Sequence, residues 1–490
     1  MKRNLTIAGS LLALLAGDLT SLSTQAQAPT GAAERTIPYY ISRASFQMPT
    51  VLVPHFPARS FSILDYGAVG DGQTLNTAAF EKAIQACAAA GGGRVIVPPG
   101  LWLTGPILFQ SNIDLHLEQG AQVQFTRDHS QYPLIPAPGG GSSQLITSPI
   151  FGTNLQNIAI TGEGILDGAG DSWRPVKKSK VTAAQWKGLL SSWGTLSPDG
   201  EIWWPGKEAI GNGAPDLRPY MVYFINCKKL LLEGVTIRNS PKFVFYPSKC
   251  QDLTMDRVTI FNEWWAQNGD GIDISACKNV IIYRCTVSAG DDGICMKSSG
   301  NPPAGGVNLE NVIVAGCTVY HAHGGFVIGS NTDGGMRHIE VSDCNFIGTD
   351  IGLRFKSNMG RGGLVSEIYI HDIFMQDIVN EAILFDTYYE DLPAGAVKTS
   401  AKAAPREKTP EFRDFHISRV YCNGAKTAIA ITGLPQMPVS RIFFDNMVIS
   451  SVKGLVATQA KEIDLHQVKL ITGKGPSIQA DSTAEVRSRD

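Results

Sequence analysis

Charged side chains are scarce in this sequence. They make up 18% of the 490 residues, and 42 basic against 44 acidic residues leave a formal net charge of −2. No run or stripe of basic residues is present, which argues against nucleic acid as a partner, because proteins that bind it cluster Lys and Arg against phosphates. Hydrophobic residues still reach 43%, so a packed core is expected and disorder is not.

Long apolar runs are also missing after the N-terminus. A membrane-spanning helix needs roughly 18 or more consecutive apolar residues, and none is expected here. The N-terminus itself differs, because Lys2 and Arg3 precede an apolar stretch over 5–16, followed by small and polar residues to Ala28. This order is typical of a secretory signal peptide. We predict a cleaved signal over 1–28 and a periplasmic or extracellular protein.

The nine cysteines lack any CxxC pair, so no zinc-binding spacing is present, and we expect neither a metal nor a cofactor. Because nine is odd, at least one thiol is free or pairs between chains. Six cysteines recur in one local context, which indicates small apolar residues stacked in a core, although a Cys277–Cys285 bridge stays open. The six are Cys227, Cys250, Cys277, Cys285, Cys317 and Cys344.

Glycine, by contrast, is abundant at 51 residues, and the chain contains an internal repeat. Ten segments, such as NVIIYRCTV and NVIVAGCTV, share an alternating apolar triplet, two or three turn-like residues and a second alternating triplet. We call the first apolar residue of each segment its marker; from Leu230 onward the markers recur every 21 to 47 residues. The markers are Ile158, Leu230, Leu253, Val280, Val312, Ile339, Ile368, Phe415, Ile442 and Ile463.

This repeat predicts the fold class. Alternation with period two marks strands that are buried on one face, and repeats of this length without long helices mark a solenoid of β coils. A leucine-rich repeat would need a fixed register of asparagine and leucine, which is missing. We predict an all-β fold, a single-stranded right-handed parallel β-helix with about ten or more coils. The helical pattern over 77–90 is expected to cap its N-terminal mouth.

The same pattern divides the chain into domains. Two intervals break the repeat and are expected to be loop insertions, one of them rich in tryptophan and the other in Ala, Pro and Lys. The predicted segments are a signal peptide over 1–28, an N-terminal extension over 29–59, a β-helix catalytic domain over 60–475 with insertions at about 174–218 and 391–411, and a C-terminal tail over 476–490.

Ionisable residues follow the markers of four consecutive coils at similar offsets. Residues at one offset occupy the same sector of a solenoid, so we expect their side chains to converge. The set is Asp270 at 17 residues after its marker, Asp291 and Asp292 at 11 and 12, His323 at 11, and Arg354 and Lys356 at 15 and 17.

Crowded carboxylates cannot all stay ionised, so one pKa rises and provides a general acid while the others remain bases, as glycoside hydrolysis requires. The alternative for a single Asp-Gly is a simple turn, and an acidic cluster can also bind calcium.

Arg354 and Lys356 stand two residues apart in a predicted strand, so both side chains point to the same side and suit the carboxylate of a ligand. The alternative is a solvated pair of charges on the surface. Glycines beside the acidic residues would let a sugar ring approach.

Over roughly residues 60–470 the sequence resembles glycoside hydrolase family 28, the polygalacturonase-like pectinases. DYGAVGDG, GGGRVIVPPG, TGPI and GEGILDGAGDSW begin the match, and the first two are shared with other β-helix enzymes. Four later motifs are more specific. They are Asn268-Gly269-Asp270, the pair Asp291-Asp292, Ala322-His323-Gly324, with alanine in place of the family's first glycine, and Arg354-Phe355-Lys356.

The resemblance implies an inverting O-glycosyl hydrolase. It implies that Asp291 protonates the leaving oxygen, that Asp270 and Asp292 activate water, and that His323 tunes the acid. It further implies that the substrate is bound by Arg354, Lys356, Asn268 and Tyr389.

We therefore predict a secreted hydrolase that cleaves α-galacturonosyl linkages in pectin. Exo action is favoured, because SSGNPPAGG lengthens the step before Val312 as in bacterial exo-acting members. Rhamnogalacturonan or a pectin side chain stays open as the substrate. Two other classes are a calcium-dependent polysaccharide lyase on the same fold and a non-catalytic β-helix adhesin.

Overall fold

The computed structural model describes residues 35–137, 143–206, 217–389 and 408–489. The predicted signal peptide over 1–28 lies outside the described residues, as does most of the predicted insertion at 391–411. Residues Ile37–Asp490 form one compact unit. Among the described residues, none of the helices combines the length and the hydropathy that crossing a bilayer requires.

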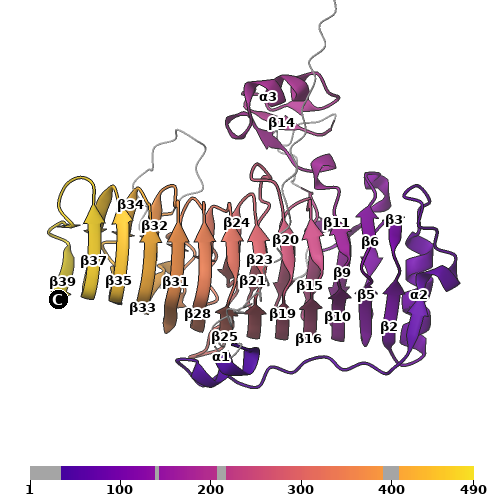
Figure 1. Cartoon of the computed structure of the whole chain (residues 1–490), viewed down its shortest axis with the longest axis horizontal. Coiled ribbons are helices and arrows are strands. Elements are labelled where there is room, and N and C mark those ends of the chain that lie inside the picture. The colour runs from indigo at the N-terminus through magenta and orange to yellow at the C-terminus, as the bar shows by residue number, and fades with distance from the viewer. Residues whose placement is uncertain (1–34, 138–142, 207–216, 390–407, 490) are drawn as a thin grey trace, which may run out of the picture. The chain divides into compact units, whose positions relative to one another are not determined.

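The unit is a right-handed parallel β-helix, as predicted, and Figure 1 shows its strands side by side in successive coils. Each marker lies directly opposite the marker of the next coil, from Ile158 opposite Leu230 to Ile442 opposite Ile463. The repeat therefore predicts the true strand register. Farther toward the N-terminus, Ile113 extends the same row.

Each coil contributes strands to three faces. The marker face consists of β1 (Ser60–Ser62), β2 (Gly93–Val97), β5 (Ile113–Leu117), β10 (Gln156–Gly162), β16 (Lys228–Glu233), β19 (Gln251–Asp256), β22 (Lys278–Tyr283), β25 (Leu309–Ala315), β28 (Met336–Ile347), β30 (Leu364–Val365), β31 (Ile368–Gln376), β33 (Glu411–Asn423), β35 (Val439–Ser451), β37 (Ala460–Thr472) and β39 (Ala484–Arg489). From β28 on, the long strands of this face continue into the second face.

The second face consists of β3 (Gly100–Thr104), β6 (Ala121–Phe125), β11 (Ile165–Asp167), β17 (Thr236–Arg238), β20 (Thr259–Phe261), β23 (Thr286–Ser288) and β26 (Thr318–Tyr320). The third, which we call the site face, consists of β4 (Ile107–Leu108), β9 (Ile150–Thr153), β15 (Val222–Ile225), β18 (Phe245–Ser248), β21 (Ile272–Ser275), β24 (Asp292–Lys297), β27 (Gly324–Ile328), β29 (Leu353–Lys356), β32 (Glu381–Asp386), β34 (Thr427–Thr432), β36 (Lys453–Thr458) and β38 (Ile478–Ala480).

A left-handed backbone residue precedes every marker. Its φ lies between 52° and 62°, a conformation that is uncommon outside glycine but tolerated by Asn and Asp. Some of these side chains bond from coil to coil: Asn311 Nδ2 donates to Asn279 Oδ1 at 3.1 Å, and Asn279 Nδ2 donates to Asp252 Oδ1 at 3.0 Å. The chain therefore turns at the same point in each coil. The bend residues are Asn157, Lys229, Asp252, Asn279, Asn311, His338, Glu367, Asp414, Arg441 and Glu462.

Buried cysteines stack between coils, as the repeat predicts. The Cys227 amide donates to Cys250 Sγ at 3.4 Å, and the Cys250 amide donates to Cys277 Sγ at 3.3 Å. All nine thiols are free and buried, so the Cys277–Cys285 bridge is not formed. Small sulfur side chains thus fill the interior where the coils turn.

We expect these thiols to be unreactive in the folded protein. Thiolates are the reactive species, and burial raises the pKa of Cys87 to about 11 and that of Cys422 to about 12. A thiol-specific chromogenic disulfide should therefore label close to none of the cysteines in buffer and nine per chain in denaturant. Rapid labelling of several thiols in buffer would contradict the packed stacks.

Helix α2 (Thr77–Ala89) lies against the first coil, where its buried Phe80, Ile84 and Cys87 join the core. Asn76 precedes the helix, but its side chain makes no helix cap. Instead its Oδ1 accepts from the Val69 amide at 2.7 Å and thereby ties the preceding loop. The predicted helix is confirmed, and Figure 1 shows it beside β2.

The tryptophan-rich interval is more than a loop, contrary to our expectation. Its described part contains the short helix η4 (Lys178–Lys180), α3 (Ala183–Leu190) and an antiparallel sheet of β12 (Val176–Lys177), β14 (Ile202–Trp204) and β13 (Thr195–Leu196). Thr182 and Gln185 form a capping box for α3. Trp186, Trp203 and Trp204 are buried, so these indoles pack this insertion.

Smaller elements complete the unit. Helix α1 (Ile37–Arg43) and the segment after it cover the outside of the marker face, where Tyr40, Met48 and Val51 pack on Ile281 and Ile313. The remaining elements are η1 (Ile63–Tyr66), η2 (His129–Gln131), the hairpin of β7 (Leu134–Pro136) and β8 (Gln144–Ile146), and η3 (Gly170–Ser172).

Candidate active site

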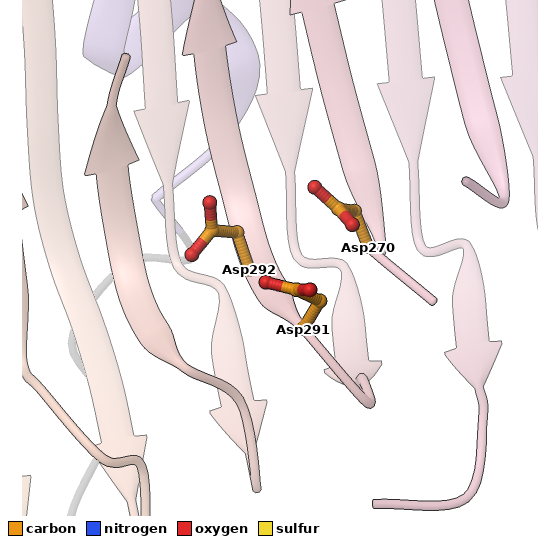
Figure 2. Close-up of side chains that lie close together, drawn as sticks. All are labelled: Asp270, Asp291 and Asp292. Carbon is orange, nitrogen blue, oxygen red and sulfur yellow. The ribbon is translucent and has the colours of Figure 1, made fainter. Parts of the chain in front are cut away.

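Three aspartates converge where neighbouring coils enter the site face. Asp270 lies two residues before Ile272 of β21, and Asp292 lies two residues before Ile294 of β24; these isoleucines are register partners. Asp291 precedes Asp292 in the turn. Carboxylate oxygens of the three, one from each, lie within 4.8 Å of one another, and Figure 2 shows the group. The offset rule therefore predicts this convergence correctly.

The glycines beside the aspartates have a different cause from the one we expected. A Cβ on Gly290 would lie 2.3 Å from the carbonyl oxygen of Ala266, and one on Gly271 would lie 2.6 Å from that of Gly293. Both positions need glycine because backbones of neighbouring coils approach closely there. Access for a sugar ring does not have to be invoked for either.

Arg354 and Lys356 stand on the same side of β29, as alternation predicts, while Phe355 between them is buried in the core. Both bind Asp292: Arg354 Nη1 lies 3.0 Å from Oδ1, and Lys356 Nζ lies 2.7 Å from Oδ2. Arg354 Nε has no hydrogen-bond partner among the described residues. The ring of Tyr389 lies near both cations, with its centroid 5.0 Å from Lys356 Nζ.

His323 joins this group through Asp291. Its Nδ1 lies 3.1 Å from Asp291 Oδ1, and its Nε2 lies 2.9 Å from Lys180 Nζ and 3.7 Å from Asp350 Oδ2. Sequence reasoning missed Lys180 because it belongs to the tryptophan-rich insertion, outside the repeat. No offset from a marker could have placed it beside the histidine.

Asn268 is held by the far end of the same interval. Arg218 Nη2 donates to Asn268 Oδ1 at 2.9 Å, and Arg218 Nη1 donates to the carbonyl of Gln267 at 2.8 Å. Asn268 itself has a left-handed φ of 53°. The structure therefore places Asn268 at the bend that leads to Asp270.

A buried ion pair lies next to the aspartates. Lys297 Nζ is 2.9 Å from Asp273 Oδ1 and 3.5 Å from Asp270 Oδ2, and Asp273 is fully buried. Sequence reasoning did not assign either residue. Both occupy outward positions in β21 and β24, so strand alternation applied to charged residues near Asp270 and Asp292 would have found them.

The electrostatic environment separates the carboxylates. Burial, reinforced by the nearby Asp273, raises the pKa of Asp270 well above its ordinary value. Burial alone would also raise the pKa of Asp291, but the hydrogen bond from His323 and nearby positive charges keep it below its ordinary value. For Asp292, Lys356 and Arg354 likewise outweigh burial and lower the pKa. The expected raised pKa therefore lies on Asp270 and not on Asp291.

The oxygen spacing of Asp270, Asp291 and Asp292 would also suit a divalent cation. Their surroundings point elsewhere, because the ammonium groups of Lys297 and Lys356 already lie 3.5 Å from Asp270 and 2.7 Å from Asp292. Protein cations therefore balance much of the negative charge, and the cluster does not need an ion for that purpose.

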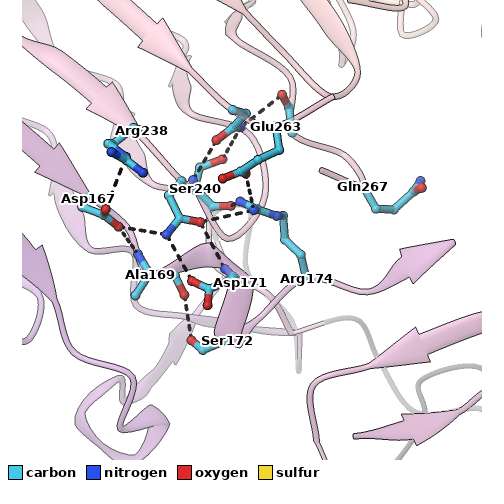
Figure 3. A network of polar contacts seen from close by, with 12 residues as sticks. Asp167, Ala169, Asp171, Ser172, Arg174, Arg238, Ser240, Glu263 and Gln267 are labelled. Atoms are coloured by element: carbon cyan, nitrogen blue, oxygen red, sulfur yellow. Dashed lines mark hydrogen bonds and ion pairs between the residues drawn. The ribbon is translucent and has the colours of Figure 1, made fainter. Parts of the chain in front are cut away.

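Figure 3 shows the polar contacts of Arg174, at the start of the insertion, with residues of the neighbouring coils. Arg174, whose side chain is 4% exposed, lies 2.8 Å from Glu263 and also contacts the carbonyl of Ser240. Glu263 belongs to the loop that leads to Asp270. Beyond the anchor, Lys180 and Trp264 line a hollow next to His323 and Asp350. The insertion therefore lies beside His323, which contacts the aspartate cluster through Asp291.

Residues 177–404 match the family model described as Glycosyl hydrolases family 28. Over these residues, which are close to half of the chain, the protein is similar to this family. Residues 60–187 match the model described as Rhamnogalacturonase A/epimerase, pectate lyase-like. The match to the family 28 model and the polygalacturonases among the protein's relatives indicate that it is an O-glycosyl hydrolase.

Among the relatives of this protein, a probable polygalacturonase of Vitis vinifera is 28% identical over 83% of this chain and 76% of its own. An exo-poly-alpha-D-galacturonosidase of Dickeya chrysanthemi is 27% identical over 80% and 67%. The crystal structure of an exopolygalacturonase from Thermotoga maritima is similar, with 28% identity, a TM-score of 0.70, and coverage of 87% of this chain and 95% of that one.

Proposed function

We propose that the protein is a secreted polygalacturonase that hydrolyses α-galacturonosyl linkages from a chain end with inversion. The observation that carries this proposal is the cluster itself. Three carboxylates lie within 4.8 Å of one another, and two adjacent cations, Arg354 and Lys356, flank them. Acid and base carboxylates supply the hydrolytic chemistry, and the cations suit a uronate carboxylate.

We assign the leaving-group proton to Asp291, with Asp270 and Asp292 as the residues that hold the attacking water. Asp292 suits a base because two cations keep it ionised. In the free enzyme the proton resides preferentially on Asp270, whose pKa is raised. A uronate bound at Arg354 and Lys356 would offset the positive charge that lowers the pKa of Asp291, so substrate binding favours transfer of the proton to Asp291.

Inversion is tested by the anomer of the first product. The carboxylates here are closer than the ~6.5–9.5 Å usual in inverting pairs, so the family resemblance supports inversion, and the spacing does not. We expect early proton NMR spectra of the digest to show the β-anomer of the new reducing end, followed by mutarotation. Release of the α-anomer first would overturn the assignment of water activation to Asp270 and Asp292.

Exo action is supported by the insertion, which borders the cluster through Lys180, and by the exo activity of the similar Dickeya chrysanthemi and Thermotoga maritima proteins. An insertion that blocks one side of the substrate site favours binding of a chain end over binding of an internal linkage. We expect one small product from polygalacturonate, with reducing ends rising long before viscosity falls. A rapid loss of viscosity with mixed oligomers would show endo action instead.

The same digestions separate the other candidate substrates and reactions. The match to the rhamnogalacturonase model over 60–187 makes rhamnogalacturonan the second polymer to test, and polygalacturonate should be the better substrate. A lyase would produce an unsaturated, ultraviolet-absorbing product and lose activity with a chelator. The proposed hydrolase should give no unsaturated product and should keep its activity in the presence of a chelator.

The proposal of secretion rests on the sequence of residues 1–28, and N-terminal sequencing of exported protein tests it.

A further inference from the structure

The contact between Lys180 and His323 joins the insertion to the catalytic group. Lys180 lies at the end of η4, is half-buried, and reaches both His323 Nε2 at 2.9 Å and the Gly290 carbonyl at 3.2 Å. Gly290 directly precedes Asp291. Lys180 therefore contacts the catalytic turn twice, once through the histidine and once through the backbone.

An ammonium group has three donors and no acceptor. At 2.9 Å from Lys180 Nζ, the Nε2 atom of His323 is consequently the acceptor and carries no proton. The ring proton then lies on Nδ1, which faces Asp291 Oδ1 at 3.1 Å. Lys180 thus selects one of the two neutral tautomers and opposes the imidazolium, because a second positive charge on the ring would lie beside its own.

We propose that Lys180 is a positioning residue that holds His323 as the neutral Nδ1–H tautomer facing Asp291. The inference rests on the proposed function for its effect on catalysis. An imidazolium would stabilise the ionised form of Asp291 and make it a poorer proton donor than a neutral ring does. By keeping the ring neutral, the insertion therefore removes one positive charge that would otherwise oppose proton transfer to Asp291 when substrate binds.

The charged groups around the ring come from three elements. Asp291 faces Nδ1 from the turn before β24, Lys180 faces Nε2 from η4, and Asp350 lies 3.7 Å from Nε2 in the turn before β29. His321 lines the same hollow. Without Lys180, Asp291 and Asp350 would both favour the imidazolium, so the lysine determines which form is present.

The test uses full-length protein labelled with nitrogen-15 at histidine, with His323 assigned by its loss in His323→Gln. In the wild type we expect a protonated Nδ1 and a bare Nε2, because Lys180 Nζ lies 2.9 Å from Nε2. In Lys180→Met, which lacks this donor, we expect the Nε2 signal to show protonation. Turnover of this variant should fall about 10-fold near pH 5 and recover toward pH 7.

Two variants serve as controls. Lys180→Arg keeps donors and charge at this position and should retain the tautomer. Lys178→Met changes a lysine of the same short helix that pairs with Glu201 at 3.0 Å, and it should alter neither the His323 signals nor the pH profile. Unchanged His323 signals in Lys180→Met would overturn the inference, and they are read without any activity assay.

The two proposals fail separately. If Asp291→Asn is inactive while Lys180→Met leaves the His323 signals unchanged, the hydrolase proposal stands and the inference is wrong. If Asp291→Asn keeps full turnover while Lys180→Met shifts the His323 signals, Lys180 positions the histidine and the assignment of the acid is wrong. A shift in the signals with no change in pH profile would show a structural contact without a role in catalysis, which overturns the catalytic part.

Discussion

Replacing Asp291 with Asn is expected to lower turnover of polygalacturonate by about 10³-fold or more. The amide has nearly the shape of the carboxylate but cannot deliver the proton that the leaving oxygen needs. Initial rates of reducing-end release at saturating substrate measure the effect. The fold should survive, because the change retains the side chain's volume and an acceptor for His323 Nδ1, which lies 3.1 Å away.

Stability should respond to this change in a pH-dependent way. The pKa of Asp291 is lowered in the folded chain, so its ionised form stabilises the fold above the unfolded-state pKa near 4, and this contribution is lost as the pH falls. Asp291→Asn should therefore lower the melting temperature slightly at neutral pH and less at acid pH. Circular dichroism at both pH values checks this and shows that the variant is folded.

Asp445→Asn is the matched control, because Asp445 pairs with His466 on the exposed marker face, away from the cluster. The turnover of Asp445→Asn should equal that of the wild type.

Asp270→Asn is the informative comparison, since Asp270 is the aspartate whose pKa is raised. Near-normal turnover of Asp291→Asn together with an inactive Asp270→Asn would move the acid role to Asp270.

Arg354→Gln is expected to lower kcat/KM for polygalacturonate by about 100-fold. A hydrogen bond to a charged group contributes about 1.5–3 kcal/mol, which is roughly 10- to 100-fold, and Arg354 also helps to hold Asp292 ionised. Loss of substrate binding raises KM, whereas loss of support for Asp292 lowers kcat. Full rate curves against concentration separate the two contributions.

Methyl-esterified polygalacturonate shows whether the substrate carboxylate is involved. The wild type should prefer the free acid, and Arg354→Gln should lose most of that preference. Arg337→Gln removes an arginine paired with Glu310 on the marker face and should change neither value. If Arg354→Gln kept the full preference for the free acid, Arg354 would support Asp292 without binding the uronate.

The sequence predicts the coils and most of the cluster for one physical reason. Strand alternation and a constant turn per coil leave little freedom, so aligning Val280 with Val312 by pattern also aligns them in space. Similar offsets from the markers, 17 residues for Asp270 and 11 for Asp291 and His323, then bring these residues together. Arg354 and Lys356 follow from alternation within one strand.

Other parts of the site could not be predicted from the same regularity. Lys180 comes from a segment with its own helix and sheet, so no repeat relates it to His323. The pKa order of the aspartates depends on burial and on counter-charges such as Lys297, which only the packed structure reveals. The close backbone approach that requires glycine at Gly271 and Gly290 was likewise not visible in the sequence.

Because a left-handed residue precedes each marker, the marker strand of every coil starts in the same register, whatever the length of the previous coil. Steps between the ten markers vary from 21 residues to the 72 between Ile158 and Leu230, yet all ten remain in register. Insertions between bends therefore change what surrounds the cleft without disturbing the strands that hold the carboxylates. Such a scaffold lets substrate preference diverge by loop exchange while the catalytic geometry is inherited unchanged.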